Sequence, residues 1–190
     1  AIKNYKKAIT LCPAIPNAYT ALATVLQMER EYCAAATTMK EGIKHTEPDS
    51  MEWGHFNCQL VHILADGRGK FVRPRPETTQ HQPSWFGNFS TQLAMAERCT
   101  AAAPEDSLVW AWRASLHAFR EPVSPEAAHC WQRAAVEALR HKTPGARSLT
   151  ADYLKWAHEA ETGVNGPWPG GSWEPPSADM ERRLQTKTRP

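Results

Sequence analysis

Three side chains in the stretch WGHFNCQLVH could bind a metal ion together. His55, Cys58 and His62 are three and four residues apart, and on an α-helix this spacing places them on one stripe. Imidazole and thiolate groups are common ligands of zinc and related metals. His81 or His117 could add a ligand, but the spacing matches no zinc signature. We interpret the stripe first as a surface that contacts a partner or the chain's own tail, with an ordinary packed surface or a metal site as alternatives.

Other patterns of catalytic residues are missing from the sequence. It contains no glycine-rich phosphate loop, no HExxH, no GxSxG and no paired-carboxylate motif. His129 and Cys130 are adjacent, and adjacent residues of a helix point in different directions, so a catalytic Cys–His pair is not favoured. We therefore expect no catalytic residues, no cofactor and no small-molecule substrate.

Composition and charge limit the classes of partner. The 190 residues are 42% hydrophobic, enough to bury a sizeable core, and the formal net charge of +2 does not indicate nucleic acid or an anionic membrane as the main partner. The sequence contains no run of 18 apolar residues, so it predicts no membrane-spanning helix. The five cysteines are scattered without a CxxC pair, which favours free thiols in a reducing, intracellular compartment. The chain opens at Ala1, inside a repeat, so a removed organellar leader or a missing start is expected.

The first sixty residues repeat at an interval of 34. Small, bulky and small residues recur in two segments, Ala1, Tyr5 and Ala8 followed by Ala35, Met39 and Gly42. Between them, helical spacing links Tyr19, Leu22, Ala23 and Leu26, whose counterparts 34 residues later are Trp53, Phe56, Asn57 and Leu60. The recurrence predicts burial between helices for Tyr5, Tyr19, Leu22, Trp53, Phe56, Leu60 and, from a later segment, Trp131.

This pattern resembles the tetratricopeptide repeat (TPR) family, whose 34-residue helix–turn–helix unit carries bulky and small residues at set positions. The resemblance covers about residues 1–142. It implies an all-α fold, a right-handed solenoid of about four TPR-like helix–turn–helix repeats. In such an array each helix pair buries one face against its neighbour, so small residues let the backbones approach and bulky residues fill the gap.

The third and fourth repeats are less regular. A helix is expected from about Ser50 to Leu64, followed by a loop insertion at about 65–88 without periodicity, which is typical of functional or disordered segments. The second helix of the third repeat resumes in FSTQLAMAERCTAAAP. In the fourth repeat, Ser124 and Pro125 form a good helix start. A last segment, TPGARSLTADYLKWAHEAE, is predicted to be the capping helix that such arrays need.

The chain therefore divides into a helical array, residues 1–162, and an extended tail, residues 163–190. The tail contains GVNGPWPGGSWEPP, which cannot form a regular helix or a central strand. Two tryptophans are unusual in a solvated linker. We expect Trp168 and Trp173 to anchor the tail on a surface, either of this chain or of a neighbouring subunit.

The TPR resemblance also assigns a concave groove, where members of the family bind other proteins. The residues expected to line this groove and contact a partner are Thr20, Thr24, Met28, His55, Cys58, His62 and Trp112. Some members hold the C-terminal carboxylate of chaperones with basic groove residues. The matching positions here include Asn17, Thr20 and Thr24 and provide no such basic clamp, so this function is not carried over.

The predicted function is that of a non-catalytic scaffold or adaptor. We expect it to bind other protein subunits as a peripheral member of a larger complex inside the cell, with an organelle as one compartment that the sequence allows. Two alternatives remain at this stage. One is a metal- or cofactor-holding accessory subunit that uses His55, Cys58 and His62. The other is an RNA-binding helical-repeat protein that uses the array with the basic segment RGKFVRPRP, around residues 68–75.

Overall fold

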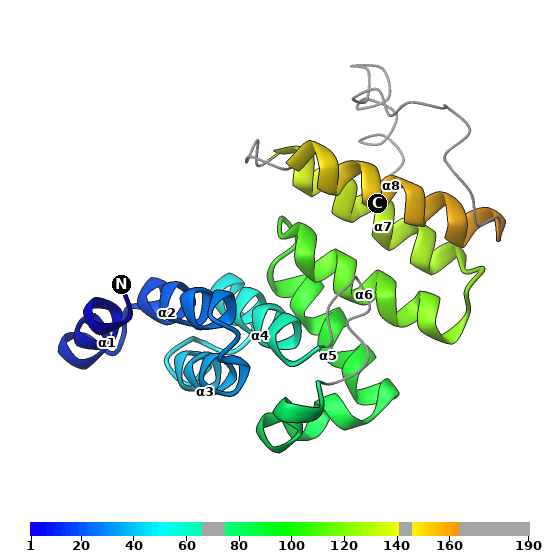
Figure 1. Cartoon of the computed structure of the whole chain (residues 1–190). Coiled ribbons are helices and arrows are strands. Elements are labelled where there is room, and N and C mark those ends of the chain that lie inside the picture. Colours follow the sequence, from blue (N-terminus) through cyan, green and yellow to red (C-terminus); the bar gives the residue numbers. More distant parts are fainter. Residues whose placement is uncertain (66–74, 141–145, 164–190) are drawn as a thin grey trace. The chain divides into compact units, whose positions relative to one another are not determined.

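The computed structural model describes residues 1–65, 75–140 and 146–163, and it is all-helical in this part of the chain (Figure 1). The helices are α1 (Ile2–Leu11), α2 (Pro16–Met28), α3 (Tyr32–Ile43), α4 (Met51–Leu64), η1 (Pro76–His81), η2 (Ser84–Gly87), α5 (Phe89–Ala102), α6 (Ser107–Arg120), α7 (Pro125–Arg140) and α8 (Ala146–Thr162), where η denotes a 3₁₀-helix. Among the described residues, no helix is both long and apolar enough to cross a membrane.

Consecutive helices pack against each other within two compact units. The N-terminal unit spans Ala1–Ala103 and the C-terminal unit spans Pro104–Pro190. In the N-terminal unit each of the helices α1 to α4 contacts the next α-helix, and α2 also contacts α4. In the C-terminal unit α6 packs on α7, and α7 packs on α8. Helices that follow one another in the chain therefore pack against each other within each unit.

The helix starts follow local capping rules. Ser50 precedes α4, and its side chain accepts a hydrogen bond of 3.1 Å from the backbone N–H of Trp53. Ser124 precedes α7 in the same way, with the N–H of Ala127 at 3.3 Å. Each serine oxygen thus satisfies a backbone donor that has no partner inside the helix. Both helix starts were predicted at these residues, and both predictions are confirmed.

The residues that recur at 34-residue spacing form the core of the N-terminal unit. Tyr19 and its counterpart Trp53 expose 2% and 7% of their surface, and the other pairs from α2 and α4 are buried as well. Asn57 replaces Ala23 in this pattern, and its buried amide donates to the carbonyl of Trp53 at 2.8 Å, which satisfies it. Trp131 is likewise buried in α7.

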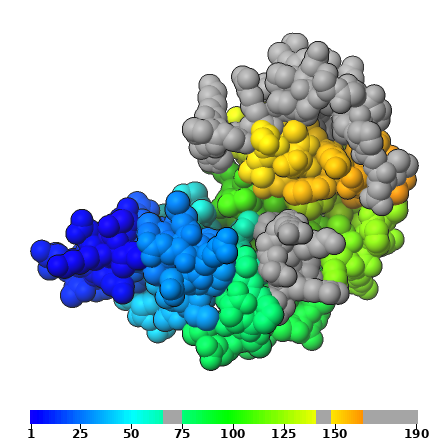
Figure 2. Space-filling model, viewed as in Figure 1, coloured from blue at the N-terminus to red at the C-terminus, as the bar shows by residue number. Residues whose placement is uncertain are grey.

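Tyr5 is the one predicted core residue that stays half-exposed. Its helix α1 packs on α2 and has no buried residue of its own. Figure 2 shows α1, in dark blue, at one end of the N-terminal unit. A helix at the end of a stack has only one neighbour, so a residue at a core position there keeps part of its surface in contact with solvent.

The predicted loop insertion contains more structure than its sequence indicates. Residues 75–88 form the short helices η1 and η2 instead of an irregular loop. The Arg75 N–H donates to the carbonyl of Leu64 at 2.7 Å, and the buried Thr78 hydroxyl donates to the same carbonyl at 3.1 Å. The Arg75 guanidinium lies 3.9 Å from the centre of the Tyr32 ring on α3. Tertiary contacts thus hold this segment; residues 66–74, with most of the basic segment, lie outside the described part.

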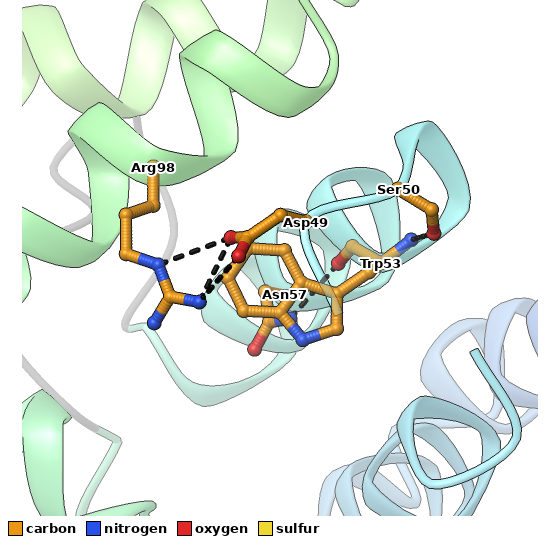
Figure 3. A network of polar contacts seen from close by, with 5 residues as sticks. All are labelled: Asp49, Ser50, Trp53, Asn57 and Arg98. Carbon is orange, nitrogen blue, oxygen red and sulfur yellow. Dashed lines mark hydrogen bonds and ion pairs between the residues drawn. The ribbon is translucent and has the colours of Figure 1, made fainter. Parts of the chain in front are cut away.

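A network of polar contacts joins the start of α4 to α5. The Arg98 guanidinium on α5 donates to both carboxylate oxygens of Asp49, at 2.8 and 3.0 Å (Figure 3). It also lies 4.7 Å from the centre of the Trp53 ring. Asp49 has a positive φ of 62°, which aspartate tolerates better than most residues. The ion pair is exposed, so we expect it to contribute no more than about 1 kcal/mol.

Gly42 on α3 lies where that helix packs closely against side chains of α2 and α4. A Cβ atom there would lie 2.9 Å from both Tyr19 Cβ and Phe56 Cε2. We therefore predict that Gly42→Ala lowers the free energy of unfolding by about 1–3 kcal/mol, although alanine is the better helix former. Guanidinium denaturation followed by circular dichroism measures this. The matched control is Gly87→Ala, where a Cβ would meet nothing within 4 Å; equal effects of the two substitutions would contradict the packing argument.

Candidate functional site

The predicted groove residues of α2 form a stripe at helical spacing. Thr20 is half-buried, and its hydroxyl donates to the carbonyls of Pro16 and Asn17 in its own helix. Thr24 is exposed, and Met28 exposes 79% of its surface. An exposed methionine is a flexible apolar contact that suits protein surfaces able to bind varied partners.

The neighbouring stripe on α4 is only partly accessible. His55 and His62 are half-buried, whereas Cys58 exposes 1% of its surface. The prediction that Cys58 lines an accessible groove is therefore wrong for its side chain. Cys58 lies on the buried side of α4 because that helix packs against both α3 and α5, which leaves a narrower free stripe than the sequence spacing implies.

Gln59 links the two stripes, and sequence reasoning missed it. Its amide nitrogen donates to the Thr24 hydroxyl oxygen at 3.2 Å. Gln59 follows Cys58 directly and lies 35 residues after Thr24, so the repeat alone does not pair them. We call the surface formed by Thr20, Thr24, Met28, His55, Gln59 and His62 the α2/α4 face.

The metal interpretation gains no further ligand from the described segments. His81, one suggested addition, lies in η1, where its ring contacts the Thr37 hydroxyl of α3 at 3.4 Å. Across residues 1–65, 75–140 and 146–163, no three His, Cys, Asp or Glu side chains are grouped so that they could hold a metal ion.

Trp112 is the second predicted groove residue whose side chain is not accessible. Its side chain is fully buried, together with Val109 and Leu116 of the same helix. These residues lie three and four positions apart and form the core stripe of α6. Trp110, two positions earlier, is half-buried and reaches the surface of the C-terminal unit. The prediction that Trp112 lies on an accessible face is therefore wrong, because packing buries its side chain completely.

The C-terminal unit holds an open cavity between α6 and α7. Its volume is about 310 Å³, and its walls are Trp110, Arg113, Pro125, Glu126, His129 and Cys130. The two residues from α6 are three positions apart, which places them on one face of that helix. The remaining four come from the first two turns of α7. His129 is exposed and Cys130 is buried, as their adjacent positions predict, yet both contribute to the wall.

Trp110 is held in place in this cavity by one hydrogen bond and three ring contacts. Its indole N–H donates to the carbonyl of Pro104 at 2.8 Å. The guanidinium groups of Arg133 and Arg113 lie 5.2 and 6.0 Å from the ring centre. The His129 ring meets Trp110 edge-on, with centroids 6.4 Å apart. These distances are in the range of cation–π and edge-to-face contacts.

The positive and negative side chains around the cavity lie at different places in its wall. His129 is exposed at its surface but partly desolvated by its neighbours, and this desolvation lowers the pKa of its imidazole; the positive charges of Arg133 and Arg113 lower the pKa further. At neutral pH, His129 is therefore uncharged beside two guanidinium groups. The carboxylate of Glu126 accepts its own backbone N–H and the Ser124 hydroxyl, and these bonds lower its pKa. This acid is thus bound at the start of α7, while the arginines lie beside the Trp110 ring.

Sequence signals for this cavity existed but were weak. Trp110 and Arg113 are three residues apart, and His129 and Arg133 are four apart, so each pair shares a helix face. Only tertiary packing brings the two faces together, because α6 and α7 are antiparallel neighbours. Of the cavity residues, only His129 and Cys130 form a pair that stands out in the sequence, so Trp110 and the two arginines were not predicted.

The predicted tail anchors, Trp168 and Trp173, lie outside the described residues. Comparison with known proteins adds no relative from which a site could be transferred. The chain matches no protein-family model and no curated protein sequence, and its structure matches no solved structure.

Proposed function

We propose that this chain is a non-catalytic scaffold that binds other proteins through a TPR-like helical array. One observation carries the proposal: residues 34 positions apart in α2 and α4 are buried alike, from Tyr19 and Trp53 to Leu26 and Leu60. Equivalent burial at a fixed interval is what a stack of equivalent helix pairs requires. On this interpretation the repeats continue as a right-handed solenoid of about four units, closed by α8.

The α2/α4 face is the proposed docking surface. Two helices that begin equivalent repeats present it, and α2 contacts α4 directly. The Gln59–Thr24 hydrogen bond connects the two helices at this surface. Met28 of α2 offers an exposed apolar side chain, and α4 contributes two half-buried imidazoles. An apolar contact surrounded by polar groups is typical of surfaces where proteins bind each other. The partner would be another protein subunit.

The test is capture of a partner followed by reconstitution. The whole chain, carrying an affinity tag, is purified gently, and a protein that it retains is then prepared alone for measurement of the dissociation constant. We predict that Thr24→Glu combined with Met28→Glu weakens this affinity at least ten-fold, because two carboxylates must then lose water on binding. Circular dichroism should show an unchanged helix content, since both side chains are exposed.

The matched control is Leu11→Glu. Leu11 is also an exposed apolar residue, at 74%, but it lies on α1 and not on the α2/α4 face. It should change the affinity less than two-fold. If the α2 double variant binds the partner as tightly as the original chain, the α2/α4 face is not the docking surface and the proposal fails.

A further inference from the structure

Apolar side chains are exposed at the turn between α6 and α7. Phe119, in the last turn of α6, exposes 51% of its surface, and Val123, four residues later, exposes 49%. Pro122, between them, is exposed as well. In the described part of the C-terminal unit, Phe119 and Val123 are the large apolar side chains that are exposed. We call Phe119, Pro122 and Val123 the α6/α7 patch, and neighbouring exposed apolar residues of this kind mark places where another segment binds.

The end of α8 is joined to this turn. The backbone N–H of Ser124 donates to the carbonyl of Ala160 at 2.9 Å, which bonds the start of α7 to the last turn of α8 (Figure 1). After Thr162, the last residue of α8, Gly163 has a φ of +72°, and its N–H donates to the carbonyl of Glu159 at 2.9 Å. Glycine adopts this left-handed conformation without steric cost and commonly ends a helix. The position at which the chain leaves α8 is therefore fixed.

Gly163 brings the chain to Val123. A Cβ atom on Gly163 would lie 3.0 Å from the Cγ2 methyl of Val123, so the tail begins beside the α6/α7 patch. Residues 164–190 follow, outside the described part of the chain. Trp168 is five residues after Gly163, and five residues span at most about 17 Å. The Trp168 ring is thus tethered within reach of the patch.

The residues around Trp168 suit a contact within the same chain. Pro167 and Pro169 flank it, and a proline restricts both its own φ and the conformation of the residue before it. Less backbone freedom is then lost when the ring docks. The short tether holds the indole at a local concentration of about a millimolar. A second chain or a foreign protein would need a similar concentration to compete for the same patch with equal affinity.

We infer that the α6/α7 patch is the docking site of the chain's own tail, with the Trp168 ring packed over Phe119 and Val123. The sequence left two surfaces open for this tryptophan, one on this chain and one on a neighbouring subunit, and the position of Gly163 beside Val123 favours the first. All of these residues belong to the C-terminal unit, so the docking does not depend on the α2/α4 face.

The test is fluorine NMR of the full chain labelled with 5-fluorotryptophan. Trp168→Phe identifies the Trp168 signal as the one that disappears. A soluble gadolinium chelate broadens the signals of exposed rings, and the same ring in a blocked peptide of residues 164–176 gives the value for an undocked tryptophan. We expect the chelate to broaden the Trp168 signal of the full chain less than about half as strongly as that of the peptide. The protection should persist on dilution, because the tail is tethered.

Two substitutions locate the docking site, and one serves as the matched control. Phe119→Ser and Val123→Ser should each lower the ratio of docked to free Trp168 rings about ten-fold, because burying the exposed half of one such side chain is worth about that factor. The double variant should show the broadening of the free peptide. Leu11→Ser removes an apolar side chain that is 74% exposed, but on α1, and it should leave the Trp168 signal unchanged. Circular dichroism checks that each variant keeps its helix content.

Several outcomes would overturn the inference. Equal broadening of Trp168 in the full chain and in the peptide would show that the ring is not docked. Protection that survives both serine substitutions would place the ring on another surface, and protection that is lost on dilution would assign it to a second copy of the chain. If the double variant loses helix content, Trp168→Ala decides: the Val123 methyl signals should then shift, and unchanged signals would contradict the docking.

Discussion

Replacing Trp131 with alanine should lower the free energy of unfolding of the C-terminal unit by about 3–5 kcal/mol. Trp131 exposes only 4% of its surface. From α7 it stacks on Tyr153, with ring centroids 5.5 Å apart, and it contacts Trp156 at 4.8 Å. Both partners lie on α8, so the truncation would leave a cavity between two helices and break two aromatic contacts at once.

Guanidinium denaturation gives the total change, and hydrogen exchange followed by mass spectrometry locates it. Amide protons of α7 and α8 should exchange faster in the variant, because these two helices share the lost ring. Trp131→Phe keeps an aromatic ring in place and should cost clearly less. A loss below about 1 kcal/mol for the alanine variant would show that α8 is held by other contacts.

Replacing Glu137 with glutamine should cost about 3 kcal/mol. Glu137 is fully buried in α7 and pairs with Arg133 at 3.1 Å and Arg140 at 2.9 Å. Removing one member of a buried ion pair leaves the other charge without compensation, which costs about 3–5 kcal/mol. The lower end applies here because the Arg140 side chain is 52% exposed and can return to water, whereas Arg133 is only 17% exposed.

The same denaturation experiment separates this effect from a general loss of surface charge. Lys155 and Glu159 on α8 form a looser pair at 3.9 Å, with side chains 49% and 26% exposed, so Glu159→Gln should change stability by less than about 1 kcal/mol. Replacing Glu137 and Arg133 together by methionine should recover much of the loss, because no buried charge then remains unpaired. Similar losses in the Glu137 and Glu159 single variants would refute the buried-pair explanation.

The spacing of residues was enough to predict the helices and much of the core. Helical faces depend on residues three and four positions apart, which can be read directly from a sequence. The 34-residue recurrence selected Tyr19, Trp53 and their neighbours, and the capping residues Ser50 and Ser124 located two helix starts. These features follow from short stretches of chain, so no tertiary information was needed.

Sequence spacing could not decide which stripe of each helix stays accessible. Cys58 has the same spacing as its histidine neighbours but is covered, because α4 packs against helices on two sides. Trp112 and Trp110 are two residues apart in α6, and packing buries the first completely while the second lies in the cavity wall. The burial of a side chain depends on all the helices around it. A sequence repeat that is only weakly conserved in spacing does not say which helices these are.

The contacts between distant segments were likewise decided by the tertiary structure. Asp49 and Arg98 are far apart in the sequence, as are Thr78 and Leu64, and neither pair follows a period. The cavity around Trp110 exists because α6 and α7 lie antiparallel, which brings Arg113 and Arg133 to the same ring. Periodicity determined which residues share a helix face. Only the packing of whole helices determined which of these faces meet. The reason is that the free energy of burial depends on the surface of the neighbouring helix, which a local sequence pattern does not describe.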